Sequence, residues 1–194
     1  MTQIPSTRAT KYTRSGRAFG MAIGTLFLGV FGTAWVALSL QSTGQLHSVA
    51  IFLLAVFLAA LIAASVYTLA RTHTMANDES NAAARKKMNR AMGRINGAQW
   101  GMILLVGYGL HHFHRDAFIL PAIILIVGIH FLPLARVFQS WPDAMTGVFL
   151  VLWACTYPLV LPTNLADPVG AFVTGLLLLS CAAIHALLAL QLMR

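Results

Sequence analysis

The sequence predicts an all-α polytopic membrane protein, a helix bundle with six transmembrane helices. Of the 194 residues, 58% are hydrophobic and only 9% are charged, whereas a soluble domain carries about 25% charged residues. Several segments also carry no charge at all, and each is long enough for a membrane-spanning helix of about 20 residues. No Asp, Glu, Lys or Arg occurs at residues 18–70, 95–114, 117–135, 144–166 or 168–193.

The chain divides into a basic tail, residues 1–16, and a single membrane domain, residues 17–194. The order of the hydrophobic segments allows a grouping into three helical hairpins. Trp141-Pro142-Asp143 is expected to form a tight turn, so the predicted helices contain no carboxylate. The helices are expected at about residues 18–40, 49–70, 98–113, 117–139, 144–161 and 169–193.

Glycines recur in the first predicted helix at about four-residue spacing. Small residues at this spacing let a second helix approach closely. They favour a tightly packed first helix, within the bundle or against another copy of the chain in a homo-oligomer. The glycines are Gly20, Gly24, Gly29 and Gly32.

The one long polar segment between predicted helices contains a further amphipathic pattern at residues 78–96. Apolar residues recur at helical spacing, opposite the basic residues between Arg85 and Arg94. This pattern indicates a helix that lies on the membrane and binds anionic lipid headgroups. A solvated connector is the alternative, and nucleic-acid binding is not expected.

The distribution of basic residues predicts the orientation. The net charge is +8, and Lys and Arg concentrate on the cytoplasmic side of membrane proteins. With both termini in the cytoplasm, only Arg115 among the 13 basic residues lies outside. We therefore expect a membrane protein with both termini in the cytoplasm.

The fourth predicted helix holds the least ordinary stretch of the chain, residues 128–136. It places His130, Pro133 and Arg136 within seven residues of hydrophobic sequence. Pro133 removes one helical hydrogen bond and predicts a kink beside His130. An ionisable ring at this depth indicates a functional site, although hydrogen bonding across the bundle is the plainer interpretation.

A ligand site is expected where His130 and His185 share one layer of the bundle. Both lie on helices that run in the same direction, at similar depth, and Cys181 lies one turn before His185. Two histidines in one layer could bind a solute, relay protons, or hold haem or a metal ion. The candidate ligand-binding residues are His130, His185, Cys181, Tyr108, Ser65 and Tyr67.

A second cluster follows the third predicted helix. Histidine and carboxylate together suit a divalent metal such as zinc or copper, although adjacent histidines on one helix point in different directions. Plain interfacial histidines are the alternative. The candidate metal residues are His111, His112, His114 and Asp116.

The motifs of common enzymes, including Gly-x-Ser-x-Gly, His-Glu-x-x-His and the phosphate loop, do not occur in the sequence. The leading hypothesis is a non-enzymatic membrane protein that binds or transports a small solute. The alternatives are a haem- or metal-binding redox protein that uses intramembrane histidines, and a structural partner subunit.

The string Gly-Ile-His-Phe-Leu-Pro-Leu-Ala-Arg-Val-Phe at residues 128–138 resembles a segment of small uncharacterised bacterial inner-membrane proteins with six helices. The resemblance covers about one helix. It implies a bacterial source, location in the bacterial inner membrane and the same topology, and it implies no activity.

Overall fold

The computed structural model describes residues 14–72, 82–161, 163 and 167–193, and it is all-helical over this part of the chain. A 3₁₀ turn, Asp116–Phe118, connects the third and fourth helices. The helices are α1 (Arg14–Ser42), α2 (Ser48–Thr72), α3 (Ala82–His112), α4 (Ile119–Phe138), α5 (Trp141–Val160) and α6 (Pro168–Leu192). The predicted tail lies almost wholly outside the described residues.

Within the described residues, five helices are long and apolar enough to cross a membrane: α1, α2, α4, α5 and α6. They correspond to five of the six predicted spans, and their length and composition support the membrane class. The third helix differs from expectation because the amphipathic segment and the predicted span are one continuous helix. Its first half carries exposed Lys86, Arg90 and Arg94, and its second half exposes Leu104 and Leu105.

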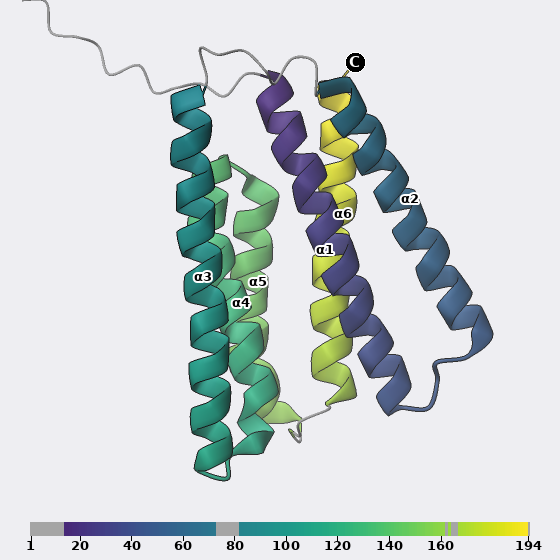
Figure 1. Ribbon diagram of the computed structural model, residues 1–194. Helices are drawn as coiled ribbons and strands as arrows, with labels where there is room; N and C mark the ends of the chain where they lie inside the picture. The colour runs from purple at the N-terminus through teal and green to yellow at the C-terminus, as the bar shows by residue number, and fades with distance from the viewer. Residues whose placement is uncertain (1–13, 73–81, 162, 164–166, 194) are drawn as a thin grey trace, which may run out of the picture.

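The bundle consists of two halves (Figure 1). In one half α1 packs against α6 and α2, and in the other α4 packs against α5 and α3. Contacts of α6 with α5 and, to a lesser extent, α4 join the two halves. Two of the predicted hairpins, α1–α2 and α3–α4, each pack within one half, whereas α5 and α6 lie in different halves and contact each other between them. The largest interfaces, α1–α6 and α4–α5, join different hairpins.

Glycines form the closest helix contacts, as the sequence predicts. A Cβ added at Gly32 would lie 2.8 Å from Leu179 Cγ on α6, and one added at Gly175 would lie 2.9 Å from the Gly32 carbonyl oxygen. A Cβ at Gly128 would similarly lie 3.0 Å from the carbonyl oxygen of Gly147. The α1–α6 and α4–α5 interfaces thus depend on positions without a side chain.

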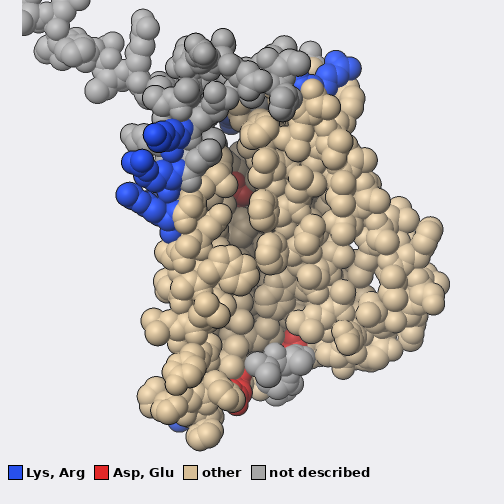
Figure 2. All heavy atoms as spheres, viewed as in Figure 1, with Lys and Arg blue, Asp and Glu red and all other residues tan. Residues whose placement is uncertain are grey.

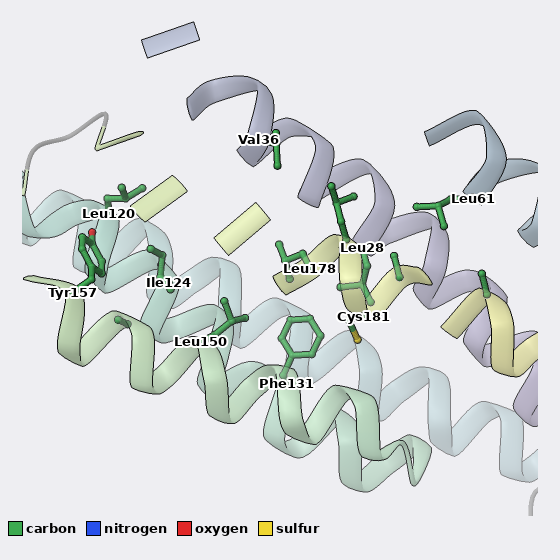
Figure 3. Packing of buried hydrophobic residues seen from close by; sticks show 14 residues of the cluster. Leu28, Val36, Leu61, Leu120, Ile124, Phe131, Leu150, Tyr157, Leu178 and Cys181 are labelled. Atoms are coloured by element: carbon green, nitrogen blue, oxygen red, sulfur yellow. The ribbon is translucent and has the colours of Figure 1, made fainter. Parts of the chain in front are cut away.

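The apolar core continues across both halves (Figure 3). Leu28 and Leu178, from α1 and α6, face the layer of Ile124, Phe131 and Leu150, from α4 and α5. Ile124 and Leu150 are fully buried. This apolar middle section lies between the polar groups near the two ends of the bundle.

Basic side chains gather at one end of the bundle (Figure 2). This end, called the basic end below, is where α1, α3 and α5 begin and where α2, α4 and α6 end (Figure 1). Arg17, Arg71 and Arg136 lie in the corresponding terminal turns. Figure 2 also shows acidic atoms set back in a furrow between the helices near this end.

Candidate metal centre

A two-residue connection positions one side of the site at the basic end. Gln139 adopts the left-handed conformation, with φ +50°, and ends α4, and Ser140 then precedes α5. Asp143 lies in the first turn of α5 and is only 3% exposed. The tight turn predicted at Trp141-Pro142-Asp143 is therefore wrong, and so is the expectation of helices without a carboxylate.

The first turn of a helix suits a carboxylate because the unpaired N–H groups there carry partial positive charge. Ser140 occupies the N-cap position, but its side chain makes no capping hydrogen bond. The hydroxyl turns toward α6 instead and lies 3.1 Å from His185 Nε2. The start of α5 thus presents a hydroxyl and a carboxylate to the facing helix.

The other side of the site lies on α6. Cys181 and His185 are four residues apart and share one helix face. Both are buried, at 1% and 3% exposure. His185 fits because α1 has a glycine opposite it: a Cβ added at Gly24 would lie 2.9 Å from His185 Nδ1.

Three potential metal ligands meet at this point, and they come from both halves of the bundle. Asp143 Oδ1 lies 3.3 Å from His185 Nε2 and accepts a hydrogen bond of 3.7 Å from the Cys181 thiol. Thr146, one turn after Asp143, also interacts with the thiol. Among the described residues, these three form the one group of His, Cys, Asp and Glu whose ligand atoms all lie within 4.8 Å of one another.

The two distances from Asp143 Oδ1 to the other ligand atoms suit a tetrahedral metal ion. Zinc binds sulfur at about 2.3 Å, and nitrogen and carboxylate oxygen at about 2.0–2.2 Å. Tetrahedral angles then separate nitrogen from oxygen by about 3.4 Å and sulfur from oxygen by about 3.6 Å. The two distances to Asp143 Oδ1, 3.3 and 3.7 Å, are close to these values, so an ion requires little rearrangement of the carboxylate.

The same atoms do not form a catalytic triad. In a Ser-His-Asp triad the serine and the aspartate bind opposite ring nitrogens, so that the ring can pass a proton between them. Here Ser140 and Asp143 both approach Nε2 of His185. The Nδ1 atom of His185 is buried and has no hydrogen-bond partner. The arrangement therefore favours ligand binding over acyl transfer.

Among the predicted ligand residues, His185 and Cys181 come together, but His130 remains apart from them. His130 lies on α4, and its ring packs edge-on against Phe131. Its Nδ1 atom is buried and has no hydrogen-bond partner. Asp143 is close enough to interact electrostatically with both histidines. Within the described residues, no hydrogen bond or ring contact joins His130 to His185, so a shared cavity for the pair stays a prediction.

The other predicted ligand residues lie elsewhere. The hydroxyl of Ser65 on α2 donates to the Leu61 carbonyl of its own helix at 2.8 Å. Tyr67 and Tyr108 are exposed on the outside of α2 and α3. Pro133 lies inside α4, which continues through it.

The outer histidine cluster forms a simple pair. His111 Nδ1 lies 2.8 Å from Asp116 Oδ1, and both side chains are substantially exposed. His112 stacks on Tyr108 with a 6.1 Å separation of ring centroids. His114 adopts a positive φ of 56° in the connection between α3 and α4. The structure thus joins two of the four candidate metal residues.

The functional residues that sequence reasoning missed are Ser140 and Asp143. Both fell in a segment interpreted as a loop, where polar residues are common. A signal was nevertheless present: a serine followed three residues later by an acid, with proline between them, is typical of a helix start. This would have placed Asp143 inside the helix, directly before the segment predicted at residues 144–161.

Comparison with protein-family models, curated proteins and solved structures finds no match to this chain. The fold and the site define its class as a helical protein with the composition of an integral membrane protein. The case for its function therefore comes from the geometry around Asp143, Cys181 and His185.

Proposed function

We propose that this protein is an integral membrane protein that binds a divalent transition-metal ion of the zinc type through Asp143, Cys181 and His185. The observation that carries the proposal is the convergence of a thiol, an imidazole and a carboxylate, all buried, within 4.8 Å of one another. Buried ionisable groups in a membrane bundle are costly and mark functional sites. The metal ion is then the small solute that the bundle binds.

The ligand set selects the class of ion. A thiolate and an imidazole favour zinc, cobalt or copper over magnesium and calcium, which prefer oxygen ligands. Three protein ligands with an open fourth position are typical of zinc sites that exchange a ligand or a water molecule. Ser140, 3.1 Å from the same imidazole nitrogen, is placed to hydrogen-bond a water molecule in that position.

The site also supports movement of the ion. Asp143 belongs to the α3–α4–α5 half and the other two ligands to the α1–α2–α6 half. An ion bound here would link the two halves near the basic end, and its release would remove that link while the apolar core still joins them. Transport of the ion is therefore the form of solute transport that this site supports. A redox role would require that the same three ligands bind a redox-active ion such as copper or iron.

Titration of the purified protein with Co²⁺ tests this proposal. We expect one Co²⁺ per chain and a near-ultraviolet charge-transfer band from the Cys181 thiolate. Cys181→Ser should abolish the band, and His185→Ala should weaken binding by more than about 100-fold, since even indirect partners of a metal site contribute about 10–100-fold.

Cys155 provides the matched control because it is the other cysteine of the chain and is exposed on α5. Cys155→Ser should retain both the stoichiometry and the band. A wild-type protein that binds no Co²⁺, or a band that is lost in Cys155→Ser and kept in Cys181→Ser, would overturn the proposal.

The proposed topology has six spans in the bacterial inner membrane, with both termini and the basic end in the cytoplasm. The exposed leucines in the second half of α3 support a sixth span, since lipid would cover them. The concentration of Lys and Arg at one end supports the orientation.

Reporter fusions test this topology. Fusions at residues 45, 114 and 165 should report the outside, and fusions at residues 85 and 194 the cytoplasm. If α3 did not cross the membrane, the reporters at residues 85 and 114 would report the same side of the membrane. This result would contradict the six-span topology.

A further inference from the structure

An open pocket lies at the basic end, directly beside the proposed metal site. It has a volume of about 290 Å³, roughly that of ten water molecules. Its lining comes from the start of α1, the α4–α5 connection and the end of α6. Ser140 belongs to this lining, while its hydroxyl lies 3.1 Å from His185 Nε2. Ser140 therefore borders both the pocket and the metal site.

The polar groups of this pocket suit an anion rather than a bare cation. Its lining residues include Arg17, whose side chain carries a guanidinium, and Gln139 and Gln191, whose side chains carry amides. A guanidinium repels a free divalent ion but binds a carboxylate through two parallel hydrogen bonds. Carboxylates are also metal ligands. A small polycarboxylate can therefore hold the ion and present a free carboxylate to Arg17.

We propose that the metal ion reaches the site as a small anionic carboxylate complex that docks in this pocket. This inference rests on the proposed metal function and names the form in which the ion arrives. The carboxylate binds Arg17 and the two glutamine amides, and the ion faces Ser140. The ion then passes to Asp143, Cys181 and His185, which lie behind the serine hydroxyl.

The transfer is a ligand exchange without electron transfer. The bonds between the ion and its carrier break, and bonds from the ion to the Asp143 carboxylate, the His185 imidazole and the Cys181 sulfur form. The thiol loses its proton to water as sulfur binds, and the carrier leaves as the free anion. With a doubly charged ion and a triply charged carrier, the total charge is the same before and after the exchange.

A neighbouring pocket supplies a matched control. It has a volume of about 380 Å³ and shares Ser140 and Trp141 with the first pocket. Its other lining residues are Leu132, Ala135, Arg136 and Ala144. It therefore also carries one arginine at the basic end, but no side-chain amide. Arg136→Gln removes the same charge as Arg17→Gln and leaves the docking pocket intact.

The experiment measures the rate of Co²⁺ loading through the thiolate band, in detergent, with the full-length protein. Co²⁺ is supplied as the aqua ion or as its citrate complex, at the same concentration of free Co²⁺. We expect loading from citrate to be about tenfold faster, a size typical of electrostatic steering. Arg17→Gln should remove this advantage, Arg17→Lys should retain part of it, and Arg136→Gln should retain all of it.

Equal rates from both sources, or an equal loss in Arg136→Gln and Arg17→Gln, would overturn the proposal. The pocket would instead be a lipid headgroup site if phosphatidylglycerol, but not phosphatidylcholine, abolished the citrate advantage, and this too would overturn it. The final Co²⁺ occupancy separates the two proposals. Full occupancy without a citrate advantage contradicts only the docking pocket, whereas no occupancy contradicts the metal function itself.

Discussion

Replacing either Asp143 or His185 with alanine is expected to destabilise the bundle by about 3 kcal/mol, because each change leaves the other buried group without its partner. Both side chains are 4% exposed, with 3.3 Å between Oδ1 and Nε2. The double variant Asp143→Ala/His185→Ala removes both polar groups together. It should cost less than the sum of the single changes, with a coupling energy above about 1 kcal/mol.

The chain contains its own control for this effect. His111 and Asp116 are closer, at 2.8 Å, but their side chains are 76% and 46% exposed. Water screens such a pair, so each replacement there should cost at most about 1 kcal/mol. Chemical denaturation in detergent measures all of these variants. The account would be contradicted if the losses of unfolding free energy at Asp143 and His185 were additive. A larger loss at the exposed pair would contradict it as well, because the buried contact would then not be an energetically coupled pair.

Gly24→Ala is expected to weaken Co²⁺ binding at least about tenfold, although Gly24 contributes no ligand. The new methyl group would lie 2.9 Å from His185 Nδ1, so either the ring or α1 must shift. Overpacking of this kind also costs about 1–3 kcal/mol of stability. Gly24 is thus a positioning residue for His185.

Gly20→Ala, one turn earlier on α1, is the matched control. A Cβ there would lie 3.5 Å from Phe138, which is ordinary van der Waals contact, and alanine favours helix over glycine by about 0.5–1 kcal/mol. This variant should keep both its stability and its Co²⁺ affinity. Equal Co²⁺ affinity in the two variants would show that the fit between α1 and His185 does not matter for the site.

Much of the fold follows from the sequence because membrane helices obey simple rules. Charge-free segments of sufficient length predicted α1, α2, α4, α5 and α6, and glycine spacing predicted the close approach of α1. The third helix was harder to predict because its basic half and its apolar half each resemble a separate element. A helix can continue through such a change in composition when its backbone hydrogen bonds are unbroken.

The candidate site was predicted in part. Depth along α6 identified His185 and Cys181, since helical rise converts residue number into height. Depth does not determine which way a side chain points around the helix axis, nor which helices pack against each other. The pairing of His185 with Asp143 results from α6 packing beside the start of α5. Local sequence does not encode this contact between helices.

The most direct test of the metal proposal is X-ray absorption spectroscopy of the Zn²⁺-loaded protein. One sulfur at about 2.3 Å and nitrogen or oxygen ligands at about 2.0–2.2 Å are expected in a four-coordinate shell. The sulfur should disappear in Cys181→Ser and remain in Cys155→Ser. Zinc bound only by nitrogen and oxygen in the wild-type protein would contradict a site built from Asp143, Cys181 and His185.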